Sequence, residues 1–210
     1  MSTVPVRGVS LTERLYPDLS WRAIADIDLL IDPGDVRAAY DALKQLGMAD
    51  AENPWNTEAL DRLARRSVLH DPELRLVSAQ GGSVELHWDW VEPALPTDDL
   101  CSAPEAYLVY LCRHAGKHFW WDLRWLTDIE LFLREFGANL DWDLVWRLGR
   151  ANGAARSCAA TLQLCARLFG RELHVEFQRH SHAAGGRLAR SAEQWLIEGK
   201  TSPFWDRPVV

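Results

Sequence analysis

Hydrophobic residues change their spacing near residue 100 of this 210-residue chain. Before that point, short apolar runs are bounded by Gly and Pro, and residues 24–31 begin by alternating apolar and acidic side chains, as a strand does. After it, apolar residues recur every three or four positions, which is typical of amphipathic helices. The two periods predict an α+β protein, with a mixed β-sheet and helices in residues 1–95 and a helical domain in residues 104–210.

Turn and capping residues bound the expected elements. A Gly81-Gly82 pair between two extended runs indicates a β-hairpin. Three prolines near residues 92–103 indicate a linker between the halves. Strands are expected at 3–6, 24–31, 73–79 and 83–90, and helices at 10–16, 34–46, 60–68, 104–118, 120–136, 139–152, 155–170 and 186–198.

The strand expected at 24–31 carries two carboxylates, Asp26 and Asp28, in an otherwise apolar stretch. Side chains two positions apart on a strand point to the same side, roughly 6 to 7 Å apart. Two such carboxylates repel and raise each other's pKa, and a divalent cation between them relieves both effects. The pattern leaves two interpretations open: a metal site, or the solvent face of an amphipathic strand.

A third carboxylate, Glu85, lies in another apolar strand. If the two strands are neighbours, Glu85 completes a metal triad with Asp26 and Asp28. If they are not, Glu85 or His87 pairs with an arginine. Glu85, His87 and Asp89 share the parity of their strand and point the same way. We expect Glu85 to be a metal ligand and His87 to contact that ligand or the substrate.

Several polar residues could bind an anion such as phosphate. Gly8 would let the backbone approach phosphates at the start of a helix, or it is a plain strand-to-helix turn. Arg22 could contact such an anion, pair with Asp18 or lie in solvent. His114, Lys117 and His118 share one helical face, because positions i, i+3 and i+4 are neighbours. The two histidines have the spacing of metal ligands, but no third ligand is obvious.

Composition excludes several classes of function. The formal net charge of −7 argues against long nucleic acid as a partner. No run of about 18 apolar residues exists, so we expect no membrane span. The start of the chain lacks the apolar core of a secretory signal, and none of the four cysteines forms a CxxC pair. Together these features predict a cytoplasmic protein with reduced thiols.

The order of these motifs resembles the bacterial uncharacterised nucleotidyltransferases, within the polymerase-beta-type nucleotidyltransferase superfamily. The similarity covers roughly residues 5 to 170. Arg7 stands where the family usually has Lys, and Ser10 follows Gly8 one position later than in the superfamily's Gly-Ser turn. The stretches that carry the resemblance are Arg7-Gly8, Leu15-Tyr16-Pro17, Arg22, Asp26–Leu30, Glu85–Trp88, Leu111–His118 and Leu123–Asp128.

The resemblance implies a nucleotidyltransferase-type sheet whose active site lies in a cleft facing the helical domain. A nucleoside monophosphate would pass from a nucleoside triphosphate, expected to be ATP, to an acceptor, with release of pyrophosphate. Asp26, Asp28 and Glu85 would hold one or two Mg²⁺ ions, and Glu85 would also orient or deprotonate the acceptor. The residues expected to contact the nucleotide are Arg7, Gly8, Ser10, Arg22, His87, His114, Lys117 and His118.

Two alternatives to this function remain open. The altered turn at Gly8 is also compatible with a catalytically weakened nucleotide-binding or regulatory partner protein. A tailoring enzyme that moves a phosphoryl group would use similar residues. The acceptor could be a small molecule, a peptide, a saccharide or a protein.

Overall fold

The structure is a computed structural model, and it describes residues 3–51, 73–88, 102–172 and 184–198. These residues fall into two compact units. The first comprises residues 3–51 and 73–88 with Ser102, and the second comprises residues 103–172 and 184–198.

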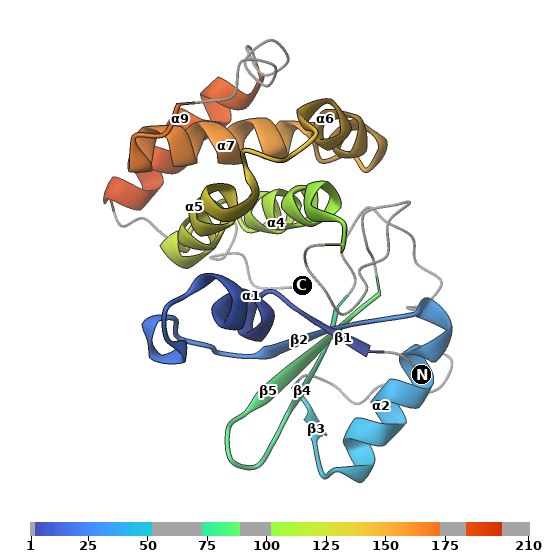
Figure 1. Cartoon of the computed structure of the whole chain (residues 1–210). Coiled ribbons are helices and arrows are strands. Elements are labelled where there is room, and N and C mark those ends of the chain that lie inside the picture. Colours follow the sequence, from blue (N-terminus) through green and yellow to red (C-terminus); the bar gives the residue numbers. More distant parts are fainter. Residues whose placement is uncertain (1–2, 52–72, 89–101, 173–183, 199–210) are drawn as a thin grey trace, which may run out of the picture. The chain divides into compact units, whose positions relative to one another are not determined.

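A five-stranded mixed sheet forms the first unit (Figure 1). Its strand order is β1-β2-β5-β4-β3, with β2 and β5 parallel and the other pairs antiparallel. The elements are β1 (Thr3–Val6), α1 (Gly8–Leu15), η1 (Leu19–Trp21), β2 (Ile27–Ile31), η2 (Pro33–Asp35), α2 (Val36–Gln45), β3 (Ala49–Asp50), β4 (Glu73–Val77) and β5 (Ser83–His87). The prediction of an α+β protein with an N-terminal mixed sheet is confirmed.

Side-chain alternation gives this sheet an apolar face and a polar face. Helix α2 covers the apolar face, and Figure 1 shows α1 over β1 and β2 on the other side. On the polar face lie Asp28 of β2 and the Glu85 and His87 side chains of β5. The cluster against α2 contains Leu29, Ile31, Leu74, Leu76, Val84, Leu86, Trp88, Val36, Ala39 and Tyr40. Because these apolar side chains are buried against α2, the alternating carboxylates of Asp28 and Glu85 point to the opposite face of the sheet.

The hairpin expected around Gly81-Gly82 is present, with Val77 of β4 opposite Ser83 of β5. Gly81 has a positive φ of 87°, which glycine adopts without steric cost. Strand β2, expected from residue 24, begins at Ile27. Ile24 precedes it and is 41% exposed, so its apolar side chain does not add to the core. The short strand β3 was not expected from the sequence.

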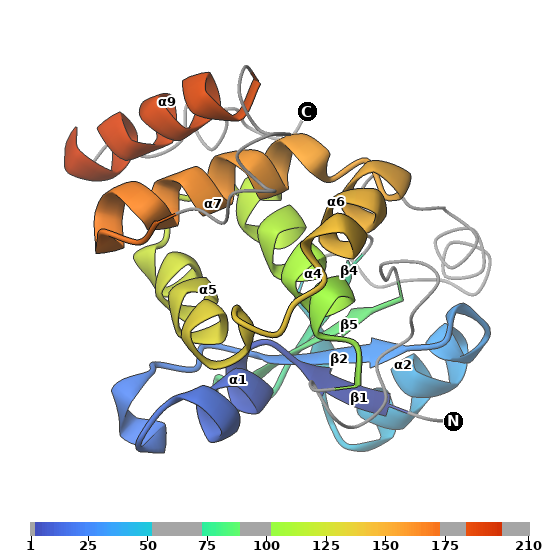
Figure 2. The same cartoon turned by 45° about the horizontal axis from the view of Figure 1, so that its top comes forward.

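The second unit is helical in the part of the chain that the structure describes. Helix α7 packs against α4, α5, α6 and α9, as Figure 2 shows. The bounds are α4 (Pro104–Lys117), α5 (Leu123–Phe136), α6 (Trp142–Ala151), α7 (Ala155–Phe169) and α9 (Ala184–Glu198). Asp122 and Asp141 cap the N-termini of α5 and α6, and Gly170 ends α7 in the left-handed conformation. All five helices lie within about three residues of their expected bounds.

A buried acid, Glu130 of α5, holds two arginines in this unit. Arg171 donates to both carboxylate oxygens at 2.8 and 2.9 Å, and Arg134 Nε donates at 2.8 Å. Burial raises the pKa of Glu130, but the hydrogen bonds from Arg171 and Arg134 outweigh burial and leave the pKa below its ordinary value of 4.5. The ionised carboxylate therefore stabilises the fold above about pH 4.5, and this contribution is lost as pH falls through the lowered pKa.

We expect Glu130→Gln to lower the free energy of unfolding by about 2 kcal/mol at pH 7, because the charged hydrogen bonds are lost. The difference from the wild type should shrink below pH 4. Urea unfolding followed by circular dichroism at both pH values measures it. The exposed Glu135 of the same helix provides the control, Glu135→Gln, which should change stability by less than about 0.5 kcal/mol.

Some expectations lie outside the described residues. These are the helix at 60–68, the linker near 92–103 apart from its last two residues, the far end of the strand at 83–90, and the predicted domain end at residue 95. The division of the chain into domains at 1–95 and 104–210 stays a prediction. Among the helices of the described ranges, none has the length and apolar character needed to cross a membrane.

Candidate active site

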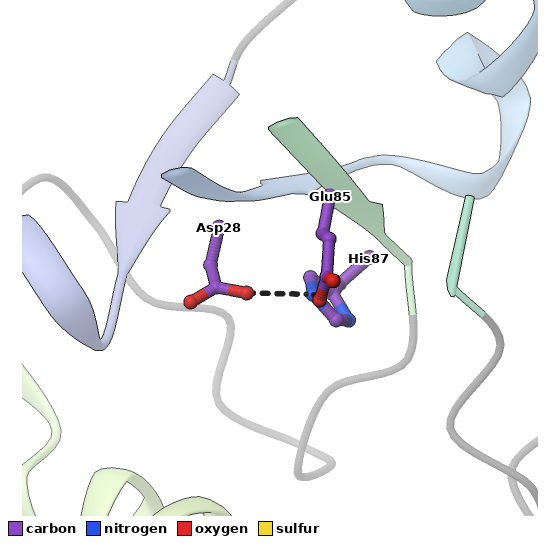
Figure 3. A group of neighbouring side chains, drawn as sticks. All are labelled: Asp28, Glu85 and His87. Carbon is purple, nitrogen blue, oxygen red and sulfur yellow. Dashed lines mark hydrogen bonds and ion pairs between the residues drawn. The ribbon is translucent and has the colours of Figure 1, made fainter. Parts of the chain in front are cut away.

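The parallel pairing of β2 with β5 builds the site. Its register places Asp28 opposite Glu85, and Leu30 opposite His87. Opposed residues of paired strands point to the same face. Figure 3 shows Asp28, Glu85 and His87 reaching toward one another from the two strands. The condition set by the sequence, that the two acidic strands be neighbours, is therefore met.

Asp28, Glu85 and His87 are close enough to hold one metal ion. Each offers a ligand atom, and these atoms lie within 4.8 Å of one another. His87 Nε2 lies 3.0 Å from Asp28 Oδ1 and 3.7 Å from Glu85 Oε2 (Figure 3). Asp28 and His87 are buried, and Glu85 is half-buried. Two carboxylates and an imidazole, shielded from bulk water, form a donor set suited to a divalent cation.

Two arginines neutralise this acidic group. The guanidinium of Arg7, only 5% exposed, forms an ion pair with Asp28 and places Nη2 2.9 Å from His87 Nε2. Arg75 of β4 lies opposite Glu85, with its Nε 3.7 Å from Glu85 Oε1, and its side chain is exposed. The Arg7 contact is the buried one, so it dominates the charge balance at Asp28.

His87 Nε2 has two competing partners. A guanidinium only donates, so the contact with Arg7 is a hydrogen bond only when Nε2 carries no proton. The carboxylate of Asp28 only accepts, so that contact requires a proton on Nε2. One nitrogen cannot satisfy both at once. A cation next to Nε2 favours the tautomer that leaves Nε2 unprotonated, because the lone pair then faces the cation.

The two paired carboxylates have lowered pKa values. Burial raises the pKa of Asp28, but the contacts with His87 and Arg7 outweigh burial. The same holds for Glu85: burial raises its pKa, the contact with His87 lowers it, and the charge of Asp28 raises it again, with a net lowering. Both groups are therefore ionised at neutral pH, as metal ligands must be.

Asp26 differs from Asp28, which lies two positions later in the chain. It precedes β2, is half-buried and is not a member of the group within 4.8 Å. Burial raises its pKa, and the charges of Asp28 and Glu85 raise it further. The structure thus groups His87 with Asp28 and Glu85, while Asp26 lies close enough for their charges to act on it. A ligand role for Asp26 stays a prediction.

The turn at the start of α1 lies beside the segment that precedes β2. Gly8 is the first residue of α1, and Ser10 Oγ donates to the carbonyl of Pro5 at 2.6 Å. A Cβ at Gly8 would lie 3.6 Å from Arg22 Nη1 and 3.6 Å from the Asp26 carbonyl oxygen. Gly8 and Arg22 therefore lie beside the segment that leads into Asp28, as a phosphate-binding turn would require.

Gly8→Ala tests whether that turn binds phosphate. The contacts of the added methyl group are of ordinary van der Waals length, so we expect stability to change by less than about 1 kcal/mol. Triphosphate affinity should fall at least about tenfold if the backbone must approach the phosphates. Thermal unfolding and calorimetric titration with a non-hydrolysable triphosphate measure the two effects. Unchanged affinity would leave Gly8 as a structural turn.

The histidines expected to contact nucleotide lie in the second unit. His114 and His118 have ring centroids 4.7 Å apart, and both rings contact Trp125 at 5.0 and 5.1 Å. His114 is buried and His118 is half-buried. Lys117 is the last residue of α4 and is half-buried. Their role toward a nucleotide stays a prediction.

Sequence reasoning gave Arg7 a phosphate-binding role and missed its contact with Asp28. It also treated His87 as a neighbour of the ligands and not as a member of the metal-binding group. The signal for His87 was its parity with Glu85 two positions earlier. No comparable signal existed for Arg7, because it lies 21 residues from Asp28 in the chain.

The mixed sheet, with acidic side chains on two adjacent parallel strands, agrees with the nucleotidyltransferase-type sheet that the resemblance implies. Residues 1–170 match the family model described as an uncharacterised nucleotidyltransferase, and the chain belongs to this family. No curated protein and no solved structure matches the chain.

Proposed function

We propose that this protein is a metal-dependent nucleotidyltransferase that moves a nucleoside monophosphate from a triphosphate, ATP by preference, to an acceptor. One observation carries the proposal: Asp28, Glu85 and His87 of this nucleotidyltransferase family member lie within 4.8 Å of one another on paired parallel strands. A mechanism without bound cations would leave the charge of the triphosphate next to these carboxylates uncompensated.

The donor set fits a divalent cation. Asp28 and Glu85 supply the oxygen ligands that Mg²⁺ prefers, and His87 Nε2 also suits Mn²⁺. In this proposal Asp26 joins them as a ligand: burial and the charges of Asp28 and Glu85 raise its pKa, and a shared cation would relieve that repulsion. A cation held there supplies charge neutralisation and activation of the attacking oxygen. Among these residues, Glu85 is our candidate to orient or deprotonate the acceptor.

The remaining candidates would bind the triphosphate. Gly8 and Ser10 at the start of α1 would present backbone N–H groups, and Arg7 and Arg22 would neutralise phosphate charge. From the helical unit we propose His114, Lys117 and His118 as further contacts to the triphosphate.

The acceptor in this proposal is a small molecule, a peptide, a saccharide or a protein. We also propose a cytoplasmic location, with which the free, buried thiols of Cys112, Cys158 and Cys165 agree.

Position-specific labelling of the triphosphate tests this function. The protein is incubated with cell extract and Mg²⁺ or Mn²⁺, together with ATP labelled at either the α- or the γ-phosphate. We expect label from the α-phosphate to appear on an acceptor while pyrophosphate is released. Transfer of the γ-label would indicate a phosphoryl-transferring enzyme. The Asp28→Asn variant is the control for contaminating activities.

A nucleotide-binding or regulatory protein is the second candidate, and one observation favours it. Arg7 forms an ion pair with Asp28, so a cation of the protein itself already neutralises a candidate metal ligand. Such a protein would bind triphosphate and transfer neither label. Calorimetric titration beside the labelling experiment separates binding without transfer from catalysis.

A further inference from the structure

The buried guanidinium of Arg7 contacts two of the three residues that could hold a metal ion. Nη2 forms an ion pair with Asp28 Oδ1 and lies 2.9 Å from His87 Nε2. Oδ1 and Nε2 are also the atoms through which Asp28 and His87 face each other, 3.0 Å apart. A positive charge of the chain itself therefore lies where these two residues converge.

A guanidinium and a divalent cation cannot share that position. The cation requires a carboxylate oxygen and the lone pair of a neutral imidazole nitrogen. Arg7 engages an oxygen of Asp28 and competes for the His87 lone pair. The two positive charges would also repel strongly at a separation of a few ångströms in a site shielded from water.

The backbone of Arg7 carries strain. Its φ is 58°, in the region that long side chains rarely adopt. Arg7 is the residue before α1, and no capping hydrogen bond from its side chain is present there. Its side chain is directed instead to the carboxylate of β2. Such a conformation persists where the surrounding contacts determine it, and it is common at sites that switch between two arrangements.

We propose that Arg7 is a positioning residue that occupies the cation position until a divalent cation displaces it. The guanidinium holds Asp28 and His87 in place in the absence of the cation, and cation binding breaks the Arg7–Asp28 ion pair. This inference rests on the proposed function in one respect, that Asp28, Glu85 and His87 bind a cation. It adds that the bound cation and the ion pair exclude each other.

Titration with Mn²⁺ followed by electron paramagnetic resonance tests the competition without any activity assay. We expect Arg7→Gln to bind Mn²⁺ at least about tenfold more tightly than the wild type, because the competing charge is gone. Arg75→Gln is the matched control. It also removes a cation near the site, but an exposed one that contacts Glu85 at 3.7 Å, so affinity should change less than about threefold.

The outcomes separate this inference from the proposed function. A folded Arg7→Gln protein that binds Mn²⁺ no more tightly than the wild type overturns the competition, whether or not label transfer from ATP is intact. Absence of Mn²⁺ binding in the wild type and in Arg7→Gln overturns both the competition and the metal-dependent function. Tight binding by Arg7→Gln beside weak binding by the wild type supports the competition.

A second measurement uses the wild-type chain and does not depend on the folding of Arg7→Gln. The guanidinium nitrogen signals of Arg7 are assigned by nuclear magnetic resonance from their loss in Arg7→Lys. We expect restrained signals without Mg²⁺ and rotationally averaged signals when Mg²⁺ saturates the protein. Signals that stay restrained at saturating Mg²⁺ would show that Arg7 remains on Asp28, and the inference would be wrong.

Discussion

Asp28→Asn is expected to abolish metal-dependent triphosphate turnover and to lower the free energy of unfolding by about 3 kcal/mol. Turnover is lost because a neutral amide replaces a carboxylate ligand at the centre of the group within 4.8 Å. Stability falls because the guanidinium of Arg7, 5% exposed, loses the charge that compensates it. Transfer of the α-phosphate label and urea unfolding in metal-free buffer measure the two losses.

The matched control for this variant is Asp41→Asn. Asp41 also pairs with an arginine, Arg37, but both side chains are more than 40% exposed. Solvent screens that pair, so its loss should cost less than about 0.5 kcal/mol and leave turnover unchanged. Equal stability of Asp28→Asn and Asp41→Asn would contradict a structural role for the buried ion pair, and unchanged turnover in Asp28→Asn would contradict the proposed site.

Asp26→Asn should have the opposite effect on stability while also abolishing turnover. The pKa of Asp26 is raised above its ordinary value of 3.8 by burial and by the charges of Asp28 and Glu85. Its contribution to stability is therefore present below about pH 3.8 and is lost as pH rises through the raised pKa. At neutral pH the charged form destabilises the fold, and asparagine removes that charge.

We expect Asp26→Asn to gain about 0.5–1 kcal/mol at pH 7 in metal-free buffer, a modest value because solvent screens a half-buried side chain. Thermal unfolding with and without Mg²⁺ measures it, and turnover should fall at least about a hundredfold. The gain should disappear when Mg²⁺ is bound to the wild type, since the cation relieves the same repulsion. Lower stability in metal-free buffer with unchanged nucleotide binding would indicate a structural Asp26.

Local sequence patterns predicted most elements of both units. The helices of the second unit could be located because their apolar periodicity and capping residues act within a few turns of chain. The hairpin at Gly81-Gly82 could be located because a tight turn fixes its own register. The start of β2 was placed three residues too early, because the alternation at Ile24 cannot reveal that this side chain is exposed.

The candidate site depended on pairings that no local pattern encodes. Sequence alone gave Asp28 and Glu85 as acids in apolar strands and gave the parity that joins Glu85 to His87. It could not decide that β2 pairs with β5, because strand pairing over 57 residues is set by the cluster under α2.

The separation of Asp26 from Asp28 was likewise a tertiary outcome. Both are Asp, two residues apart, and parity alone assigns them one role. Burial raises the pKa of both carboxyls. The contacts with His87 and Arg7 outweigh burial and lower the pKa of Asp28, whereas the charges of Asp28 and Glu85 raise the pKa of Asp26 further. The sequence by itself thus indicated the candidate groups and, for Asp28, Glu85 and His87, the strands on which they lie. Only the tertiary structure decided which of these groups meet and that the guanidinium of Arg7 lies against Asp28 and His87. Burial and electrostatic interaction depend on distance in space and not on distance along the chain.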